Sequence, residues 1–190
     1  MKSIELLKLL QRINKPFYTI ADLEKITNLP RSSLYVTLRR WVASGIIERV
    51  AQGIYLTMGS LISVENVASQ LYIPNYLSFE SALAKHGILN LIPYALTFAT
   101  SRKTRKYTLK QQQVEFRQIA SKLFFGFELK NGMSVALPEK AFLDQLYFVG
   151  RGKTTIDFDE LDIKKLSIKI LRELAKRFPS YVQNRVKKMI

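Results

Sequence analysis

Arginine and hydroxyl side chains recur within residues 31–44, where helical spacing would bring them to one side. With about 100° between successive residues, Leu34, Leu38, Trp41 and Val42 form an apolar stripe that we expect to be buried. The opposite side has no acidic residue, and it carries Arg31, Ser32, Ser33, Tyr35, Val36, Arg39 and Arg40. Guanidinium and hydroxyl groups donate hydrogen bonds to phosphate oxygens and base edges. The pattern predicts a helix that ends at Gly45 and contacts nucleic acid with its outer face.

A second basic cluster contains Arg102, Lys103, Arg105, Lys106 and Lys110, with no acidic residue anywhere in residues 101–113. Cations at this density repel one another unless a polyanion or an acidic partner neutralises them. We expect the first four to contact DNA phosphates or an acidic protein, the alternative being a solvated rim. The segment 163–190 is also basic, and a solvated surface explains it equally well.

Residue types that support catalysis or metal binding are scarce. The chain has no cysteine and a single histidine, His86, which excludes disulfides and sulfur-ligated zinc sites and leaves no catalytic triad. Residues 150–154 end like a phosphate-binding loop, but the first glycine of that motif would have to stand where Tyr147 does. The acidic run in residues 157–162 is better explained as favourable charge at a helix start than as a metal site. We therefore predict no enzymatic activity, no cofactor and no metal site.

The elements that must position the first basic face form a familiar order. Residues 3–14 and 20–27 have helical apolar periodicity, and Thr19 before the second segment is a suitable cap. The helix over 31–44 follows, and β-rich runs at 46–50 and 54–57 flank a turn at 51–53. Three helices followed by a hairpin predict a winged helix-turn-helix domain in residues 1–58. Its wing would bring Arg49 and Gln52 to the DNA backbone or minor groove, although such hairpins also serve protein contacts.

Residues 61–190 have the sequence pattern of mixed helices and strands. We expect helices over 63–71, 79–86 and 138–148, and strands over 95–100, 107–109, 114–119, 123–129 and 134–137. Several strands alternate in polarity, which favours a half-buried antiparallel sheet, and residues 159–190 are helical in composition. The predicted fold class is α+β: a winged helix-turn-helix, then a mixed α/β C-terminal domain with an antiparallel sheet and a helical tail.

The overall composition agrees with a globular polyanion-binding protein. The chain has 190 residues, 47% of them hydrophobic, and a formal net charge of +15. The hydrophobic fraction excludes disorder as the main state, and the charge attracts polyanions over long range. No stretch approaches 18 apolar residues, and no secretory signal is evident, so we expect a cytoplasmic protein without a membrane partner.

Three stretches resemble the AbiEi family, the antitoxin and transcriptional regulator of abortive-infection type IV toxin–antitoxin pairs. They are GIY at residues 53–55, YLSFESAL at 76–83 with HGI at 86–88, and ALPEKAFLD at 136–144. The resemblance covers about residues 1–150.

The resemblance implies a cytoplasmic bacterial protein that binds double-stranded operator DNA and represses its own operon. It also implies a second domain that counters a nucleotidyltransferase toxin, without a stable toxin–antitoxin complex. The alternative is a winged-helix transcription factor whose C-terminal domain senses a ligand or binds protein partners.

Overall fold

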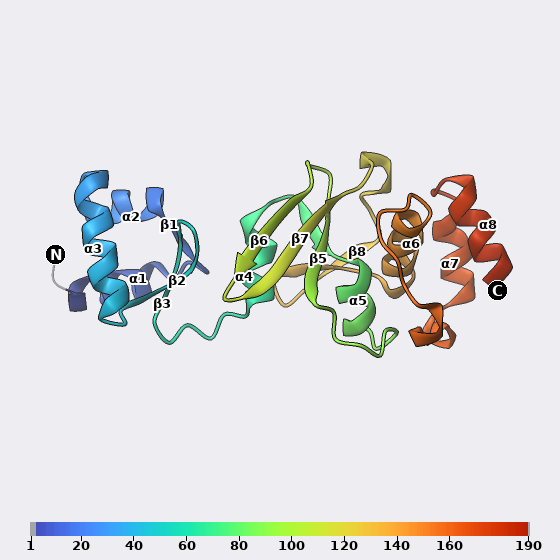
Figure 1. Cartoon of the computed structure of the whole chain (residues 1–190), viewed down its shortest axis with the longest axis horizontal. Helices are drawn as coiled ribbons and strands as arrows, with labels where there is room; N and C mark the ends of the chain where they lie inside the picture. Colours follow the sequence, from blue (N-terminus) through green and yellow to red (C-terminus); the bar gives the residue numbers. More distant parts are fainter. Residues whose placement is uncertain (1–2, 190) are drawn as a thin grey trace. The chain divides into compact units, whose positions relative to one another are not determined.

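The computed structural model describes residues 3–189, and its elements follow one another along the chain as labelled in Figure 1. Two compact units divide the chain. Unit 1 comprises Met1–Val67 together with Thr108–Gln111, and unit 2 comprises Ala68–Tyr107 together with Gln112–Ile190. The fold class is α+β, as the sequence predicted, with a winged helix-turn-helix in unit 1 and a mixed sheet with helices in unit 2.

Unit 1 consists of three helices and a small antiparallel sheet. The helices are α1 (Ser3–Ile13), α2 (Ile20–Thr27) and α3 (Arg31–Ala43). The sheet has the order β1-β3-β2, formed by β1 (Tyr18–Thr19), β2 (Ile47–Ala51) and β3 (Ile54–Thr57). The strands β2 and β3 are the predicted hairpin. The register shifts between Arg49 and Ala51, and Gly53 at the turn has φ +73°, a conformation that glycine adopts without strain.

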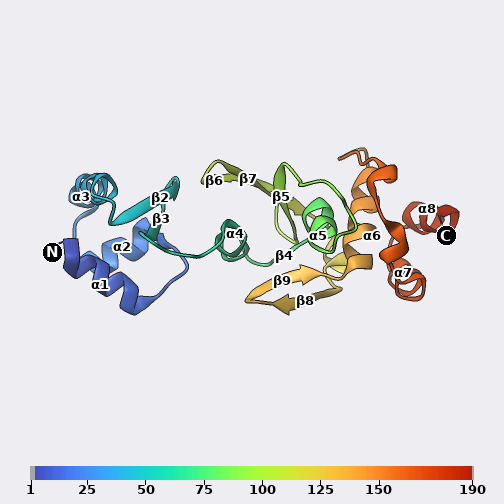
Figure 2. The ribbon, with the colours of Figure 1, turned by 90° about the horizontal axis from the view of Figure 1, so that it is seen from below.

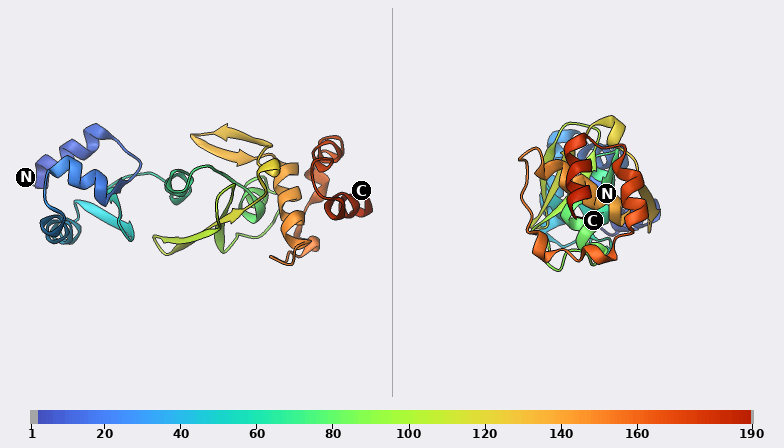
Figure 3. Two further views of the ribbon diagram at one scale, coloured as in Figure 1. Left: turned by 90° about the horizontal axis from the view of Figure 1, so that it is seen from above. Right: turned by 90° about the vertical axis from the view of Figure 1, so that its right-hand side faces the viewer.

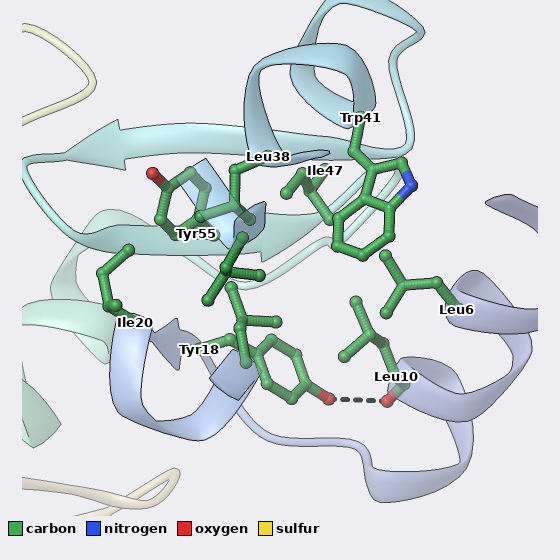
Figure 4. Close-up of a cluster of buried hydrophobic side chains, with 10 residues drawn as sticks. Leu6, Leu10, Tyr18, Ile20, Leu38, Trp41, Ile47 and Tyr55 are labelled. Atoms are coloured by element: carbon green, nitrogen blue, oxygen red, sulfur yellow. Dashed lines mark hydrogen bonds between the residues drawn. The ribbon is translucent and has the colours of Figure 1, made fainter. Parts of the chain in front are cut away.

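The core of unit 1 is formed by apolar side chains from all three helices and the hairpin (Figure 4). The Tyr18 hydroxyl donates a hydrogen bond of 2.6 Å to the Leu10 carbonyl, so its polar end is satisfied inside the core. Trp41 of α3 is buried in the same cluster. This packing fixes which side of α3 faces inward.

A capping box begins α2. The Thr19 hydroxyl accepts a hydrogen bond from the Asp22 amide, and the Asp22 carboxylate accepts one from the Thr19 amide. Burial acts to raise the pKa of the Asp22 carboxyl, but hydrogen bonds from Lys15 and Thr19 prevail and lower that pKa. The start of α2 is therefore set by Thr19, the cap that the sequence predicted, together with Asp22 and Lys15.

The sheet of unit 2 is mixed, which corrects the antiparallel sheet expected from the sequence. Its order is β6-β7-β5-β4-β9-β8. The strands are β4 (Asn75–Leu77), β5 (Ala95–Thr100), β6 (Arg105–Leu109), β7 (Gln112–Gln118), β8 (Phe127–Lys130) and β9 (Met133–Ala136). Pairing is parallel for β5 with β7 and for β4 with β9. The strand β6 lies at the edge of the sheet, and β7 turns back to lie between β6 and β5, which makes β7 parallel to β5. Alternation of polarity along each strand does not reveal this order of strands.

The helices of unit 2 are α4 (Val64–Leu71, whose first turn belongs to unit 1), α5 (Phe79–Lys85), α6 (Pro138–Val149), α7 (Ile168–Ala175) and α8 (Ser180–Met189). In the views of Figures 1 and 3, α6 lies between the sheet and the pair α7 and α8. Figure 2 shows the β8–β9 hairpin at the opposite edge of the sheet from β6 and β7.

Two sequence predictions in unit 2 need adjustment. The strand expected from residue 123 begins only at Phe127, because Ser121–Leu123 forms a 3₁₀ turn. The tail that we expected to be helical from residue 159 opens with two further 3₁₀ turns, Phe158–Glu160 and Ile163–Lys165.

A buried polar network joins α6 to β4. Lys140 and Asp144 lie one turn apart on α6, have no exposed surface and form an ion pair. The Tyr76 hydroxyl accepts a hydrogen bond of 2.7 Å from Lys140 Nζ and donates one of 2.9 Å to Asp144 Oδ2. Ser78 Oγ donates a third bond to the same carboxylate at 2.8 Å. Burial lowers the pKa of Lys140 and raises that of Asp144, so each group depends on the other to stay charged.

Candidate nucleic-acid interface

The outer face of α3 is available to a partner. Its predicted contact residues are all exposed: Arg31, Ser32, Ser33, Tyr35, Val36, Arg39 and Arg40. Tyr35 and Val36 are large apolar side chains with 46% and 58% of their surface exposed. On the inner side Leu34, Leu38 and Trp41 are buried as predicted, whereas Val42, which we expected to be buried, is 38% exposed. Val42 faces the wing instead of the core, so the buried stripe is narrower than its apolar residues suggested.

The beginning of α3 has uncapped backbone amides and an arginine, Arg31, that lies near a carboxylate. Pro30 precedes the helix, and no side chain of the described residues caps the amides of its first turn. Such amides and the helix dipole favour an anion such as a phosphate. Arg31 Nε lies 3.5 Å from Glu24 Oε1. The Tyr35 hydroxyl and then the Glu24 carboxylate raise the pKa of Arg31, which therefore stays charged.

A concavity of about 490 Å³ lies between α3 and the wing of unit 1. Four predicted contact residues line it: Tyr35 and Arg39 from α3, and Arg49 and Gln52 from the hairpin. Arg49 Nε donates a long hydrogen bond of 3.4 Å to the Ala51 carbonyl, which leaves most of its guanidinium free for a partner. The structure therefore brings together cations from two elements that are separate in the sequence.

Two of the remaining predicted residues, Arg102 and Arg105, stack on the ring of Tyr72 in unit 2. The guanidinium carbons of Arg102 and Arg105 lie 4.4 Å and 5.2 Å from its centroid. The Tyr72 hydroxyl donates a hydrogen bond of 3.0 Å to the Lys103 carbonyl, which holds the loop against the same side chain. Cation–π stacking and this bond hold both arginines and the loop between them at the Tyr72 side chain. Sequence reasoning missed Tyr72, because it lies 30 or more positions upstream and only the fold brings it to the loop.

Two cations of this cluster have partners within the chain. Lys106 Nζ lies 2.5 Å from Glu115 Oε1 in unit 2, and Lys110 Nζ lies 2.8 Å from Glu48 Oε2 in unit 1. The expectation that only an outside partner neutralises the cluster is therefore wrong for these two lysines. No carboxylate of the described residues pairs with Arg102, Lys103 or Arg105. These three are the cations that a polyanion would meet.

The structure also bears on metal binding, on membrane insertion and on the role of the single histidine. The described residues contain no group of three or more His, Cys, Asp or Glu side chains that could hold a metal ion. Within residues 3–189, no helix has the length and apolar character needed to span a membrane. His86 Nε2 lies 2.8 Å from the Ala136 carbonyl, where it joins α5 to β9. The single histidine thus has a structural partner.

Comparisons with known proteins concern the N-terminal segment and the fold. Residues 5–57 match the family model described as "Transcriptional regulator, AbiEi antitoxin". The fold is similar to the crystal structure of the RV2827C protein from Mycobacterium tuberculosis, with a TM-score of 0.64 and 13% sequence identity. That alignment covers 97% of this chain and 74% of the other. No curated protein matches the chain.

Proposed function

We propose that this chain is an autoregulating antitoxin, and the match of residues 5–57 to the model "Transcriptional regulator, AbiEi antitoxin" supports this proposal. It binds double-stranded DNA at its own operator in the cytoplasm and represses its own operon. Its C-terminal part counters a nucleotidyltransferase toxin without forming a stable complex, and the protein has no enzymatic activity. The functional modules in this proposal are residues 1–58 and 61–190.

The observation that carries the DNA-binding part is the concavity between α3 and the wing. An α-helix is about 10–12 Å across and fits the major groove, which is about 12 Å wide. With α3 in the groove, Tyr35, Val36, Arg39 and Arg40 reach base edges, because they are exposed on its outer face. Arg49 and Gln52 across the concavity then meet the flanking backbone or minor groove.

Phosphate contacts set the position of the domain on the duplex. Arg31, Ser32 and Ser33 lie at the helix start, where open amides and hydroxyl groups can bind a phosphate. Arg102, Lys103, Arg105 and Lys106 supply a second, sequence-independent contact, in which the arginines ordered by Tyr72 contribute most. One such domain covers a half-site, so the operator should contain repeated sites.

DNase footprinting of the chain's own upstream region tests the proposal. We expect protection of repeated half-sites, and weaker binding for the Arg39→Ala variant of the full chain. If Arg39 reads a base, the loss is about 1–3 kcal/mol at one base position. Arg12→Ala is the matched control, because Arg12 is an exposed arginine in the last turn of α1. Unchanged gel-shift affinity for both Arg39→Ala and Arg40→Ala would remove the assignment of α3.

The antitoxin part is tested separately by co-expression with a neighbouring nucleotidyltransferase. Wild-type protein and Arg39→Ala should restore growth equally, because the substitution affects only the DNA-binding face. If no nucleotidyltransferase gene adjoins this one, or if co-expression gives no rescue, the antitoxin role is wrong even when footprinting succeeds.

A further inference from the structure

Unit 2 contains a concavity of about 430 Å³ that the proposed function does not use. Its lining comes from the start of α5, the loop before β5, the middle of β7 and the segment 155–160. These parts are far apart in the sequence. The concavity exists because the fold brings them together around one side of the sheet.

The charged side chains at the base of this concavity form ion pairs with one another. Arg117 Nη1 lies 2.7 Å from Glu80 Oε2, and its Nη2 lies 3.1 Å from Glu115 Oε2. Glu80 also accepts hydrogen bonds from Gln145 Nε2 at 3.0 Å and Thr154 Oγ1 at 3.3 Å. Because these groups satisfy one another, the floor is a rigid base and not a free binding group.

The wall formed by residues 155–160 carries charge that the described residues do not neutralise. Asp157 Oδ1 accepts a hydrogen bond of 3.0 Å from the Asp159 amide, but no cation of the described residues lies within 4.0 Å of the Asp157 or Glu160 carboxylate. In a chain with a net charge of +15, this concavity is a local site of the opposite sign. It repels phosphates and is therefore no part of a DNA surface.

The loop before β5, whose Asn90 amide donates a hydrogen bond to the Glu160 carbonyl, is apolar and open. Leu91, Ile92 and Tyr94 are 54%, 97% and 86% exposed, which makes this loop a dense group of large apolar side chains on unit 2. All three line the same concavity as Asp157 and Glu160. Exposed apolar side chains next to unpaired charge are typical of protein interaction sites.

We propose that this concavity is a docking surface for another protein, which presents an arginine or lysine side chain flanked by apolar residues. The cation meets Asp157 and Glu160, while the apolar neighbours cover Leu91, Ile92 and Tyr94. A guanidinium suits the two carboxylates because it offers several donors in one plane. A second copy of this chain is a poor occupant, because two molecules of net charge +15 repel each other.

The test uses the full chain and a blocked peptide in which one arginine lies between leucines. Binding is followed by NMR through the amide signals of Ala95 and Thr97, which line the concavity. We expect saturable shifts, and affinity at least about tenfold lower when citrulline, a neutral analogue of similar shape, replaces arginine. The Asp157→Asn/Glu160→Gln variant should lose affinity to the same extent. Glu128→Gln/Glu173→Gln is the matched control, since these exposed acids lie outside the concavity, and it should bind as wild type does.

Four outcomes of the binding titrations would overturn the proposal. They are no saturable shift with the arginine peptide, equal binding of the citrulline peptide, equal affinity of the Asp157→Asn/Glu160→Gln variant, and the same shifts at the same affinity with spermidine, which would indicate a small-cation site. Self-association that disappears in Ile92→Ser would assign the surface to a second copy and would also overturn it. Operator affinity, measured on the same variants, reports on α3 and the wing, so failure of DNA binding is a separate result.

Discussion

Four buried polar side chains of unit 2 join the strand β4 and its following turn to the helix α6. Lys140 and Asp144 come from the stretch ALPEKAFLD, and Tyr76 and Ser78 come from YLSFESAL. All four side chains are buried and bonded to one another. A buried ion pair contributes little net stability, but removing one partner leaves an uncompensated charge in the core. The network therefore fixes how β4 and α6 pack against each other.

Replacing Lys140 alone should show the cost of the unpaired charge. Lys140→Met leaves the Asp144 carboxylate buried without its cation, which should destabilise unit 2 by about 3–5 kcal/mol. Amide hydrogen exchange at Leu143, in the middle of α6, measures this opening locally. The double variant Lys140→Met/Asp144→Asn removes both charges and keeps an acceptor for Tyr76 and Ser78, so it should recover more than half of the loss. A double variant no more stable than the single one would show that size, and not charge, matters here.

At the scale of elements, the β8–β9 and β6–β7 hairpins adopt the same turn with different sequences. Between β8 and β9, Asn131 and Gly132 have φ values of +51° and +79°. Between β6 and β7, Lys110 and Gln111 have φ values of +47° and +69°. Two consecutive left-handed residues are what a two-residue hairpin turn requires, and Asn-Gly is its preferred sequence. The β6–β7 turn is thus formed by side chains that tolerate it poorly.

Gln111→Gly should relieve this strain. A left-handed conformation costs a residue with a Cβ about 1 kcal/mol or more, which glycine avoids. We expect the variant to be more stable by about 1 kcal/mol in urea unfolding followed by circular dichroism, with slower amide exchange at Val114. The reverse change, Gly132→Ala, has open space around the new methyl group, so strain alone should destabilise it. If both variants shifted stability in the same direction, strain would not be the cause.

Local signals explain which elements the sequence predicts and which it does not. The strand Ala95–Thr100 and the helix beginning at Pro138 have the predicted bounds to within one residue, since alternation and a first-turn proline are local. The strands β1 and β4 have two and three residues, too short to show a period. Parallel pairing within the sheet depends on contacts between distant segments.

The same limit applies to the candidate interface. The exposed side of α3 could be predicted, because its apolar stripe defines the opposite face. The concavity could not, since it requires the hairpin to fold back beside the helix. The stacking of Arg102 on Tyr72 and the pairing of Lys106 with Glu115 are tertiary contacts as well. Charge density in the sequence therefore overstated how many cations of this loop are free.

For the whole molecule, most of the positive charge lies outside the predicted DNA-reading module. Residues 1–60 contain nine Lys and Arg against four Asp and Glu, a net of +5, and residues 61–190 contain 21 against 11, a net of +10. A long-range potential of this kind promotes binding to any duplex, while base contacts select one. Affinity and specificity should therefore respond to different substitutions.

The triple variant Arg102→Gln/Lys103→Gln/Arg105→Gln tests this division. It should weaken binding to operator and random DNA by similar factors, because phosphate contacts carry no sequence information. The slope of log affinity against log salt should become shallower by about 0.9 for each phosphate that the variant no longer neutralises. Lys106→Gln is the control with a smaller expected effect, since Lys106 is paired with Glu115. An unchanged slope together with a failure to neutralise the toxin would assign the loop to the antitoxin activity.

The position of Trp41 gives the protein a built-in optical probe. The chain has one tryptophan, and it is buried on the inner side of the helix whose outer face would meet DNA. Excitation at the red edge of the protein absorption band, where tyrosine contributes little, therefore reads unit 1 alone. Its emission should stay blue-shifted while unit 1 is folded, whatever happens to unit 2. Comparing this emission with the circular dichroism of the whole unlabelled chain can thus show whether the two units unfold together or one after the other.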